Sequence, residues 1–198
     1  EEQRVRGFTE SMSMNITYED TDAETEGEWI KIAEDANDAF RRQGNRIHVR
    51  LRGRYVSIIR LDEKTMTCMD SICYHAGGPL TLGDIEEIDG EKCVKCPWHH
   101  YALRLRDGKK LSQGLTISPS GAMVPTGWQA SSSSLQRVHD VVIKDGGLFV
   151  RLRGENKVRS DNYAFNEAAG QLVLSRNSTS AGSDGKVNQN NMKKRTSG

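Results

Sequence analysis

The sequence predicts a small all-β domain, and three observations lead to this fold class. Short runs that alternate apolar and polar side chains, such as residues 46–51, indicate strands with one buried and one exposed face. Asp and Gly residues separate these runs at the spacing of tight turns. The triplet Asp145-Gly146-Gly147 lies between two apolar runs, as the turn of a β-hairpin does.

The expected elements follow one another along the chain. A short strand is expected at residues 29–33, and a helical turn over residues 35–42 should end before Gly44. Further strands are expected at residues 46–51, 55–61, 65–69, 93–94, 101–106, 138–143 and 148–152. Residues 113–134 hold two Pro and four consecutive Ser, so we expect a long exposed loop there.

The 198 residues are a length that suits one domain with tails. We expect an acidic, flexible N-terminal arm at residues 1–27 and the folded domain at residues 28–155. Residues 156–174 should form a C-terminal extension that packs back on the domain. Residues 175–198 are rich in Ser, Asn, Gly and Lys, and they should form a disordered tail because they cannot bury enough apolar surface.

Two short Cys/His pairs carry the chemistry of this sequence. The first is Cys73-Tyr74-His75, which precedes a Gly-Gly-Pro turn, and the second is Cys96-Pro97-Trp98-His99. Two thiolates and two imidazoles on two loops can hold a [2Fe-2S] cluster in which two His replace two Cys on one iron. The same four donors can also bind zinc as a tetrahedral Cys2His2 site. Cys93-x2-Cys96 taken alone is similar to half of a zinc ribbon or to a thioredoxin-like motif.

The spacing of these pairs resembles the Rieske iron-sulfur family. Cys-x-His is followed, after 20 residues between His75 and Cys96, by Cys-x2-His. The resemblance covers residues 29–152, and the run from Cys73 to Leu103 looks most like the small soluble Rieske-type ferredoxins of eukaryotes. It implies the Rieske fold, an antiparallel β-sandwich or barrel with a small cluster-binding subdomain inserted at about residues 70–104.

The resemblance also implies the residues of the site. One [2Fe-2S] cluster per chain would be held by four ligands, namely Cys73, His75, Cys96 and His99. Cys68 and Cys93 are expected to be buried small apolar residues rather than ligands. His48 and His139 are expected in structural roles, and His100 as a surface neighbour of the site.

The function that the resemblance implies is electron transfer rather than catalysis. A ferredoxin of this kind carries one electron from a flavin-dependent ferredoxin reductase to an oxygenase or another acceptor, here as a monomer. A redox-sensing or regulatory module and the Rieske component of a multi-subunit oxygenase stay open as alternatives. An oxygenase would need a second iron site made of two His and a carboxylate, and the His residues outside the two loops are not arranged for one.

The reduction potential should lie toward the low end of the Rieske range. Rieske subunits of quinol-oxidising complexes carry an extra Cys in each ligand loop, whereas Gly78 and Trp98 stand at these positions here. Those proteins also place a Ser and a Tyr after the second loop, where this chain has Tyr101 and Leu103. Losing these hydrogen-bond donors lowers the potential.

The net charge and the apolar content limit the remaining classes of function and location. The net charge of +1 provides no general attraction to nucleic acid or to a membrane surface. No apolar run approaches the roughly 18 residues needed to span a bilayer, so no membrane anchor is expected. Thiolates that must stay reduced until they bind metal fit an intracellular compartment, and the cytoplasm is the expected one.

Overall fold

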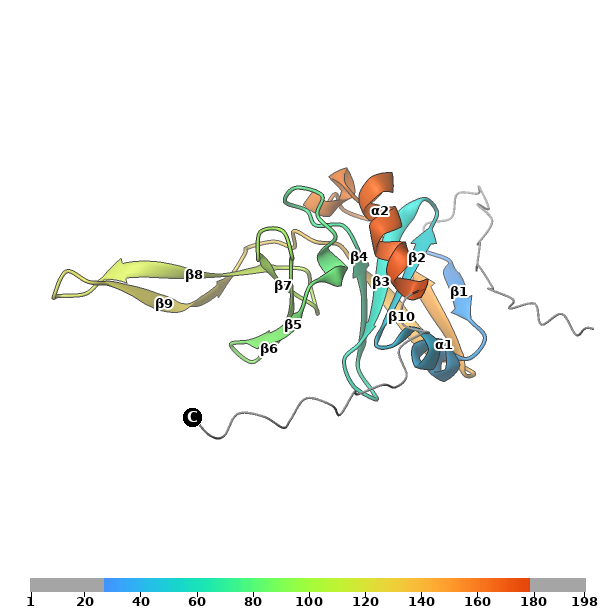
Figure 1. Ribbon diagram of the computed structural model, residues 1–198. Coiled ribbons are helices and arrows are strands. Elements are labelled where there is room, and N and C mark those ends of the chain that lie inside the picture. The colour runs from blue at the N-terminus through green and yellow to red at the C-terminus, as the bar shows by residue number, and fades with distance from the viewer. Residues whose placement is uncertain (1–26, 179–198) are drawn as a thin grey trace, which may run out of the picture.

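A computed structural model describes residues 27–178, which form two antiparallel sheets (Figure 1). The first sheet has six strands in the order β1-β11-β10-β4-β3-β2, and the second has five in the order β5-β6-β7-β8-β9. The first sheet is built from β1 (Trp29–Ala33), β2 (Arg46–Leu51), β3 (Arg54–Arg60), β4 (Met66–Asp70), β10 (Val138–Lys144) and β11 (Gly147–Arg151). The second is built from β5 (Ile85–Ile88), β6 (Glu91–Lys95), β7 (Ala102–Arg104), β8 (Lys110–Ile117) and β9 (Met123–Ala130).

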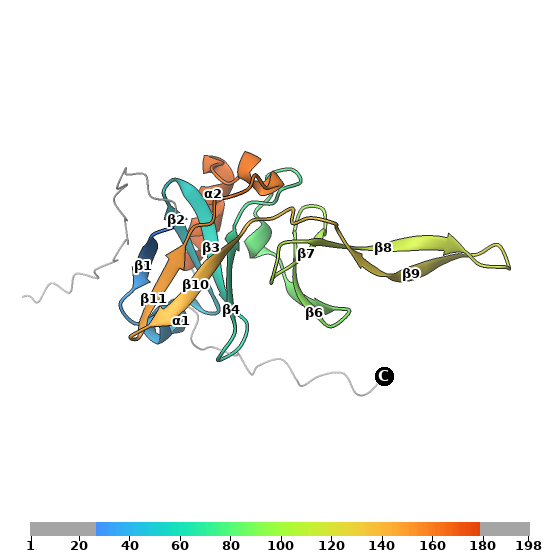
Figure 2. The ribbon, with the colours of Figure 1, turned by 180° about the vertical axis from the view of Figure 1, so that it is seen from behind.

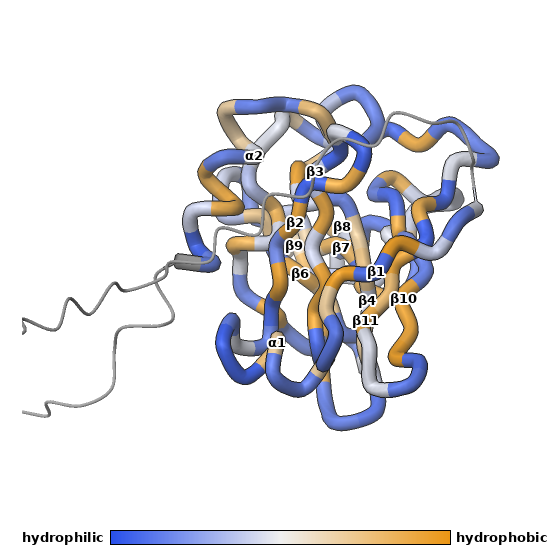
Figure 3. The backbone as a smooth tube through the Cα atoms, turned by 90° about the vertical axis from the view of Figure 1, so that its right-hand side faces the viewer, coloured by the Kyte–Doolittle hydropathy of each residue, from blue (hydrophilic) through white to orange (hydrophobic). Residues whose placement is uncertain are grey.

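The second sheet is an insertion, because all of its strands lie in the sequence between β4 and β10 of the first sheet. Below, the six-stranded sheet and its helices are called the base, and the five-stranded sheet with its loops is called the inserted subdomain. The prediction of an all-β fold with an inserted subdomain is confirmed. The tube in Figure 3 shows apolar residues along the strands and hydrophilic residues in most of the connecting turns.

Strands β3 and β4 supply both faces of the base sheet with apolar side chains. On one face Ile58 and Cys68 join the core of the base, which also contains Phe40 of helix α1 (Ala36–Gln43). On the other face Ile59 and Met69 join a second core, which they share with the inserted subdomain. Alternating side chains on two neighbouring strands therefore hold the two sheets together.

The segment predicted as a long loop at residues 113–134 is instead largely a hairpin, so that prediction was wrong. Strands β8 and β9 pair from Leu111↔Ala130 to Ile117↔Met123, and this hairpin projects away from the body of the molecule (Figures 1 and 2). At the tip, Ser118 N–H donates to the carbonyl of Ala122 over 2.8 Å.

The C-terminal extension packs on the base through a short helix, η2 (Arg159–Asn162), and helix α2 (Glu167–Leu174). Gly170 of α2 lies directly against the ring of Tyr55, where there is no room for a side chain. Regular structure continues into η3 (Ser175–Ser178), so the predicted start of a disordered tail at residue 175 was wrong. Asn177 donates from Nδ2 to the carbonyl of His48 (2.6 Å) and accepts from its N–H (3.2 Å), as a neighbouring strand would.

The rest of the predicted tail, residues 179–198, and residues 1–26 of the predicted arm lie outside the described residues. None of the helices formed by residues 27–178 has the length and apolar character needed to cross a membrane.

Candidate metal centre

The two Cys/His loops have the same backbone geometry, although they come from different places in the fold. The first loop follows β4, and the second joins β6 to β7. In the first, the carbonyl of Cys73 accepts from the N–H of Gly77 (3.0 Å), and the N–H of Cys73 donates to the carbonyl of Gly78 (2.8 Å). In the second, Cys96 makes the same two bonds with His100 (2.8 Å) and Tyr101 (2.9 Å). Each cysteine is thus presented by an equivalent tight turn.

The fourth residue after each cysteine closes its turn in the left-handed conformation. Gly77 has φ 73° and His100 has φ 56°. This region is open to glycine, while for a residue with a side chain it costs on the order of 1–3 kcal/mol. The side chain of His100 is exposed, as predicted, and its N–H completes the second loop.

The thiols of Cys73 and Cys96 are buried and in contact with each other. The hydrogen bond from Cys73 lowers the pKa of Cys96 to about 6, and the same bond together with burial raises the pKa of Cys73. Two backbone N–H groups also donate to each sulfur, those of His75 and Ala76 to Cys73 and those of Trp98 and His99 to Cys96. Such donors stabilise negative charge on sulfur.

The two imidazoles lie on the exposed side of the thiols. The ring centroids of His75 and His99 are 4.8 Å apart at 90°, and both side chains are exposed. Like donors therefore meet, sulfur with sulfur and imidazole with imidazole, which is the division that a two-iron cluster with mixed ligands requires. Within residues 27–178, no three or more Cys, His, Asp or Glu side chains gather as a site for a single metal ion.

Apart from His100, the other cysteines and histidines lie away from this pair of loops, as expected. Cys68 is buried in the base core, and Cys93 is buried in a separate cluster beside Ala102 and Leu111. His48 is buried with Nδ1 2.6 Å from the hydroxyl of Ser57, and His139 is buried with Nε2 3.1 Å from a carboxylate oxygen of Asp70. The predictions of buried cysteines and of hydrogen-bonded structural histidines are confirmed.

Two tyrosines and two cations form a layer beside the imidazoles that the sequence did not predict. The rings of Tyr74 and Tyr101 are stacked with centroids 6.2 Å apart, and the Tyr101 ring is 4.6 Å from that of His75. Lys110 Nζ lies 4.2 Å from the centroid of Tyr101, and the guanidinium of Arg159 lies 5.4 Å from that of Tyr74. These residues are dispersed from 74 to 159, so no local motif could have revealed the layer.

Two aromatic side chains cover the glycines of the first loop. A side chain at Gly78 would begin 2.8 Å from the indole of Trp98, which belongs to the second loop. A side chain at Gly77 would begin 3.0 Å from the ring of Tyr163, whose hydroxyl donates to the carbonyl of His75 over 3.4 Å. The first loop is therefore held between the second loop and the C-terminal extension.

A buried ionic network fixes the extension to the base just before the first loop. Asp70 has no exposed surface and accepts from Arg54 (2.8 Å), His139 (3.1 Å) and the hydroxyl of Ser160 (2.5 Å). Arg54 also donates to Asp161 (2.9 Å). Burial would raise the pKa of the Asp161 carboxyl, but hydrogen bonds from Arg137, a backbone N–H and Arg54 lower it well below its usual value.

The side chain of Gln136 connects this network to the ligand loop. Its amide Nε2 donates to the carbonyls of Asp70 (2.9 Å) and Ile72 (2.8 Å), and its Oε1 accepts from the N–H of Tyr74 (3.0 Å). One buried amide thus satisfies three backbone groups around Cys73, which limits the movement of that residue.

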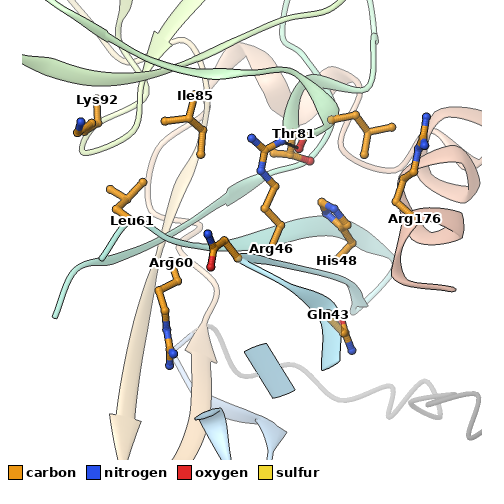
Figure 4. A pocket seen from close by; sticks show the side chains of 11 residues that line it. Gln43, Arg46, His48, Arg60, Leu61, Thr81, Ile85, Lys92 and Arg176 are labelled. Atoms are coloured by element: carbon orange, nitrogen blue, oxygen red, sulfur yellow. Dashed lines mark hydrogen bonds between the residues drawn. The ribbon is translucent and has the colours of Figure 1, made fainter. Parts of the chain in front are cut away.

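A cavity of about 670 Å³ lies between the base and the inserted subdomain, away from the four candidate ligands (Figure 4). On its wall, the guanidinium of Arg46 donates to the carbonyls of Thr81 (2.6 Å) and Gly83 (2.7 Å). Arg46 therefore ties strand β2 to η1 (Leu80–Leu82) at the start of the inserted subdomain. None of the candidate metal ligands lines this cavity.

Comparison with known proteins identifies the family. Residues 33–155 match the soluble Rieske-type ferredoxins. The chain belongs to this family. Membership implies a [2Fe-2S] cluster and electron-transfer chemistry, and the paired thiols and paired imidazoles of the two loops fit such a cluster.

Individual relatives are similar to part of this chain. The human Rieske domain-containing protein is 44% identical over 97 residues, which are 48% of this chain and 60% of the human protein. The ferredoxin of carbazole 1,9a-dioxygenase from Nocardioides aromaticivorans is 19% identical, with a TM-score of 0.42 over 63% of this chain and 98% of that one. A solved complex of oxygenase and ferredoxin in carbazole 1,9a-dioxygenase gives 20% identity and a TM-score of 0.43, over 65% of this chain and 97% of that chain.

Proposed function

We propose that this chain is a one-electron carrier in which Cys73 and Cys96 hold one iron of a [2Fe-2S] cluster, and His75 and His99 hold the other. The observation that carries the proposal is the separation of the two ligand types, with buried thiols on one side and adjacent exposed imidazoles on the other. The cluster supplies the capacity to accept and return a single electron.

The protein groups around the site stabilise its negative charge, keep water out and leave one edge open to partners. The four backbone N–H groups that point at the two sulfurs stabilise the negative charge that the site gains on reduction. The buried cysteines keep water from the sulfur side. His75 and His99 form the exposed edge through which a partner exchanges electrons.

The potential belongs toward the low end of the Rieske range of about −150 to +300 mV. Neither Gly78 nor Trp98 can form the disulfide that stiffens the high-potential sites. Leu103 is buried and has no hydroxyl to donate to the cluster. A low potential suits a carrier between a flavin-dependent ferredoxin reductase and an oxygenase or another acceptor.

The charges beside the imidazoles define a docking surface for these partners. Lys110 lies over the ring of Tyr101, which contacts the ring of His75, and Arg159 lies over the ring of Tyr74. A partner with carboxylates around its own redox centre complements this positive rim, and complementary charge of this kind raises the rate of association.

The test is electron transfer from NADPH through a ferredoxin reductase and the cluster-loaded chain to cytochrome c. The wild type should support turnover, and Lys110→Glu should raise the KM for the carrier several-fold while the cluster stays bound. Lys144→Glu makes the same charge change at the far end of β10 and serves as the control. A cluster-loaded protein that supports no turnover would contradict the carrier function and favour a redox sensor.

A further inference from the structure

The hairpin of β8 and β9 carries an exposed apolar face. Its register places Leu115 opposite Pro125 and Ile117 opposite Met123, and paired residues lie on the same face of a sheet. The exposed fractions of Leu115, Ile117 and Met123 are 61%, 72% and 67%. Trp128, which is paired with Gln113, is also exposed and continues this face toward the end of the hairpin that joins the inserted subdomain. These four large side chains are named here the hairpin face.

The hairpin also lacks charge. From Leu111 to Gln136 the sequence has no Asp, Glu, Lys, Arg or His, although 28% of the whole chain is charged. Proteins usually place charges on exposed strands because charge prevents association with other chains. An uncharged, exposed apolar strand pair is therefore a surface suited to contact with another protein.

We propose that the hairpin face packs against the same face of a second copy of this chain. A two-fold symmetric contact brings the same patch of both copies together, so a patch with net charge would repel itself, and an uncharged face avoids this repulsion. Interfaces between identical subunits are also more apolar than those between different proteins, which rely on complementary charge. This inference replaces the predicted monomer and does not depend on the proposed electron transfer.

The shape of the molecule permits such a contact. The hairpin extends from the inserted subdomain away from both the base and the helices (Figures 1 and 2). Two hairpins can thus overlap along their length while the two bodies stay apart. The imidazoles of His75 and His99 belong to the loops rather than to the hairpin, so they stay accessible to redox partners in the dimer.

The contact is made by the face of the hairpin rather than by its edge. Strand β9 is the edge strand of its sheet, but Pro125 has no N–H to donate to an added strand. The pairing register also shifts between Gln113 and Leu115, which makes the edge irregular. Each strand of the hairpin has eight residues and spans about 26 Å. A contact limited to one such hairpin from each copy buries a small area, and interfaces below about 1,200 Å² are typically weak and reversible.

Sedimentation equilibrium of the full, cluster-loaded chain tests this proposal between about 1 and about 200 µM, the range of weak reversible association. The weight-average mass of the wild type should rise reversibly toward twice the monomer mass. Ile117→Glu, which places a charge on the hairpin face, should weaken the dimer at least tenfold. Thr116→Glu places the same charge one residue away on the opposite face and should leave the dimer unchanged.

Hydrogen exchange of the β8 and β9 amides shows that each variant keeps the hairpin, and Leu115→Ser is a milder substitution on the same face. A wild type that is monomeric at every concentration would overturn the proposal and leave the hairpin face to a different partner. A dimer that Ile117→Glu and Leu115→Ser do not weaken would overturn it as well, because the chains would then meet elsewhere.

Discussion

Individual side chains divide the metal centre into a buried half and an exposed half. Cys73 comes three residues after β4 and Cys96 directly after β6, and both belong to the core that the two sheets share, so they are buried. His75 and His99 follow two and three residues later, beyond the point where each loop turns outward.

The position of each cysteine sets the expected effect of its replacement. Cys96→Ser removes a proposed iron ligand and should abolish the visible absorption and the bound iron and sulfide. Cys93→Ser, three residues earlier on β6, changes a side chain in a separate apolar cluster and should keep both. Loss of the cluster in Cys93→Ser, as measured by iron and sulfide content, would overturn the ligand assignment.

The buried His48 makes the stability of the fold depend on pH. Burial, followed by the charge of Arg46, lowers the pKa of His48 from 6.5 to about 4. Between these values the unfolded chain binds a proton that the folded chain does not, so stability is complete above about pH 6.5 and falls as the pH drops toward 4. The loss should reach on the order of 3 kcal/mol.

Urea unfolding of the wild type and of His48→Asn between pH 4 and 7 checks this expectation. The variant should be less stable at pH 7 because the bond to Ser57 changes, but its stability should vary less across this range. If the free energy of unfolding changes equally with pH in the two proteins, His48 does not contribute to the pH dependence of stability.

At the scale of elements, the C-terminal extension contacts the candidate metal centre. It reaches the first loop through Tyr163 and reaches the end of β4 through Ser160. Helix α2 then anchors the extension, because Gly170 lets the helix approach the buried ring of Tyr55. The residues of the extension that make these contacts lie beyond residues 33–155, the region that matches the family.

Gly170→Ala should therefore destabilise the protein although alanine favours helices. The new methyl group would overlap the Tyr55 ring, and overpacking of this kind costs typically about 1–3 kcal/mol. Thermal unfolding measures the effect, and Ala168→Gly on the exposed side of the same helix is the control, with an expected loss of about 1 kcal/mol. A Gly170→Ala variant more stable than the wild type would show that α2 does not pack tightly on Tyr55.

For the whole molecule, the sequence predicted the strands of the base well because they have strong local patterns. Strand β2 alternates apolar and other side chains, β3 is a short run buried on both faces, and Asp145-Gly146 forms a tight turn between β10 and β11. The four candidate ligands were found by residue type and spacing alone. The C-terminal extension was predicted to pack on the domain, but its contact with the first loop was not.

The remaining features depend on contacts that sequence patterns do not report. The sequence does not reveal the hairpin because Gly114, Pro125 and Gly127 interrupt its strands, and because its register shift breaks the alternation of side chains. The tyrosine layer is formed by residues that are far apart in the sequence, so no local pattern indicates it. Composition predicts a disordered tail at Asn177, yet this residue forms two hydrogen bonds with the backbone of β2.

The central claim is that two thiolates and two imidazoles of this chain hold one [2Fe-2S] cluster. The most direct measurement is the EPR spectrum of the anaerobically purified, dithionite-reduced protein, recorded beside His75→Ser and His99→Ser. The account predicts a rhombic signal of the histidine-ligated [2Fe-2S] type in the wild type and its loss in both variants. A protein that contains zinc, lacks sulfide and gives no EPR signal would contradict the account and make the two loops a structural metal site.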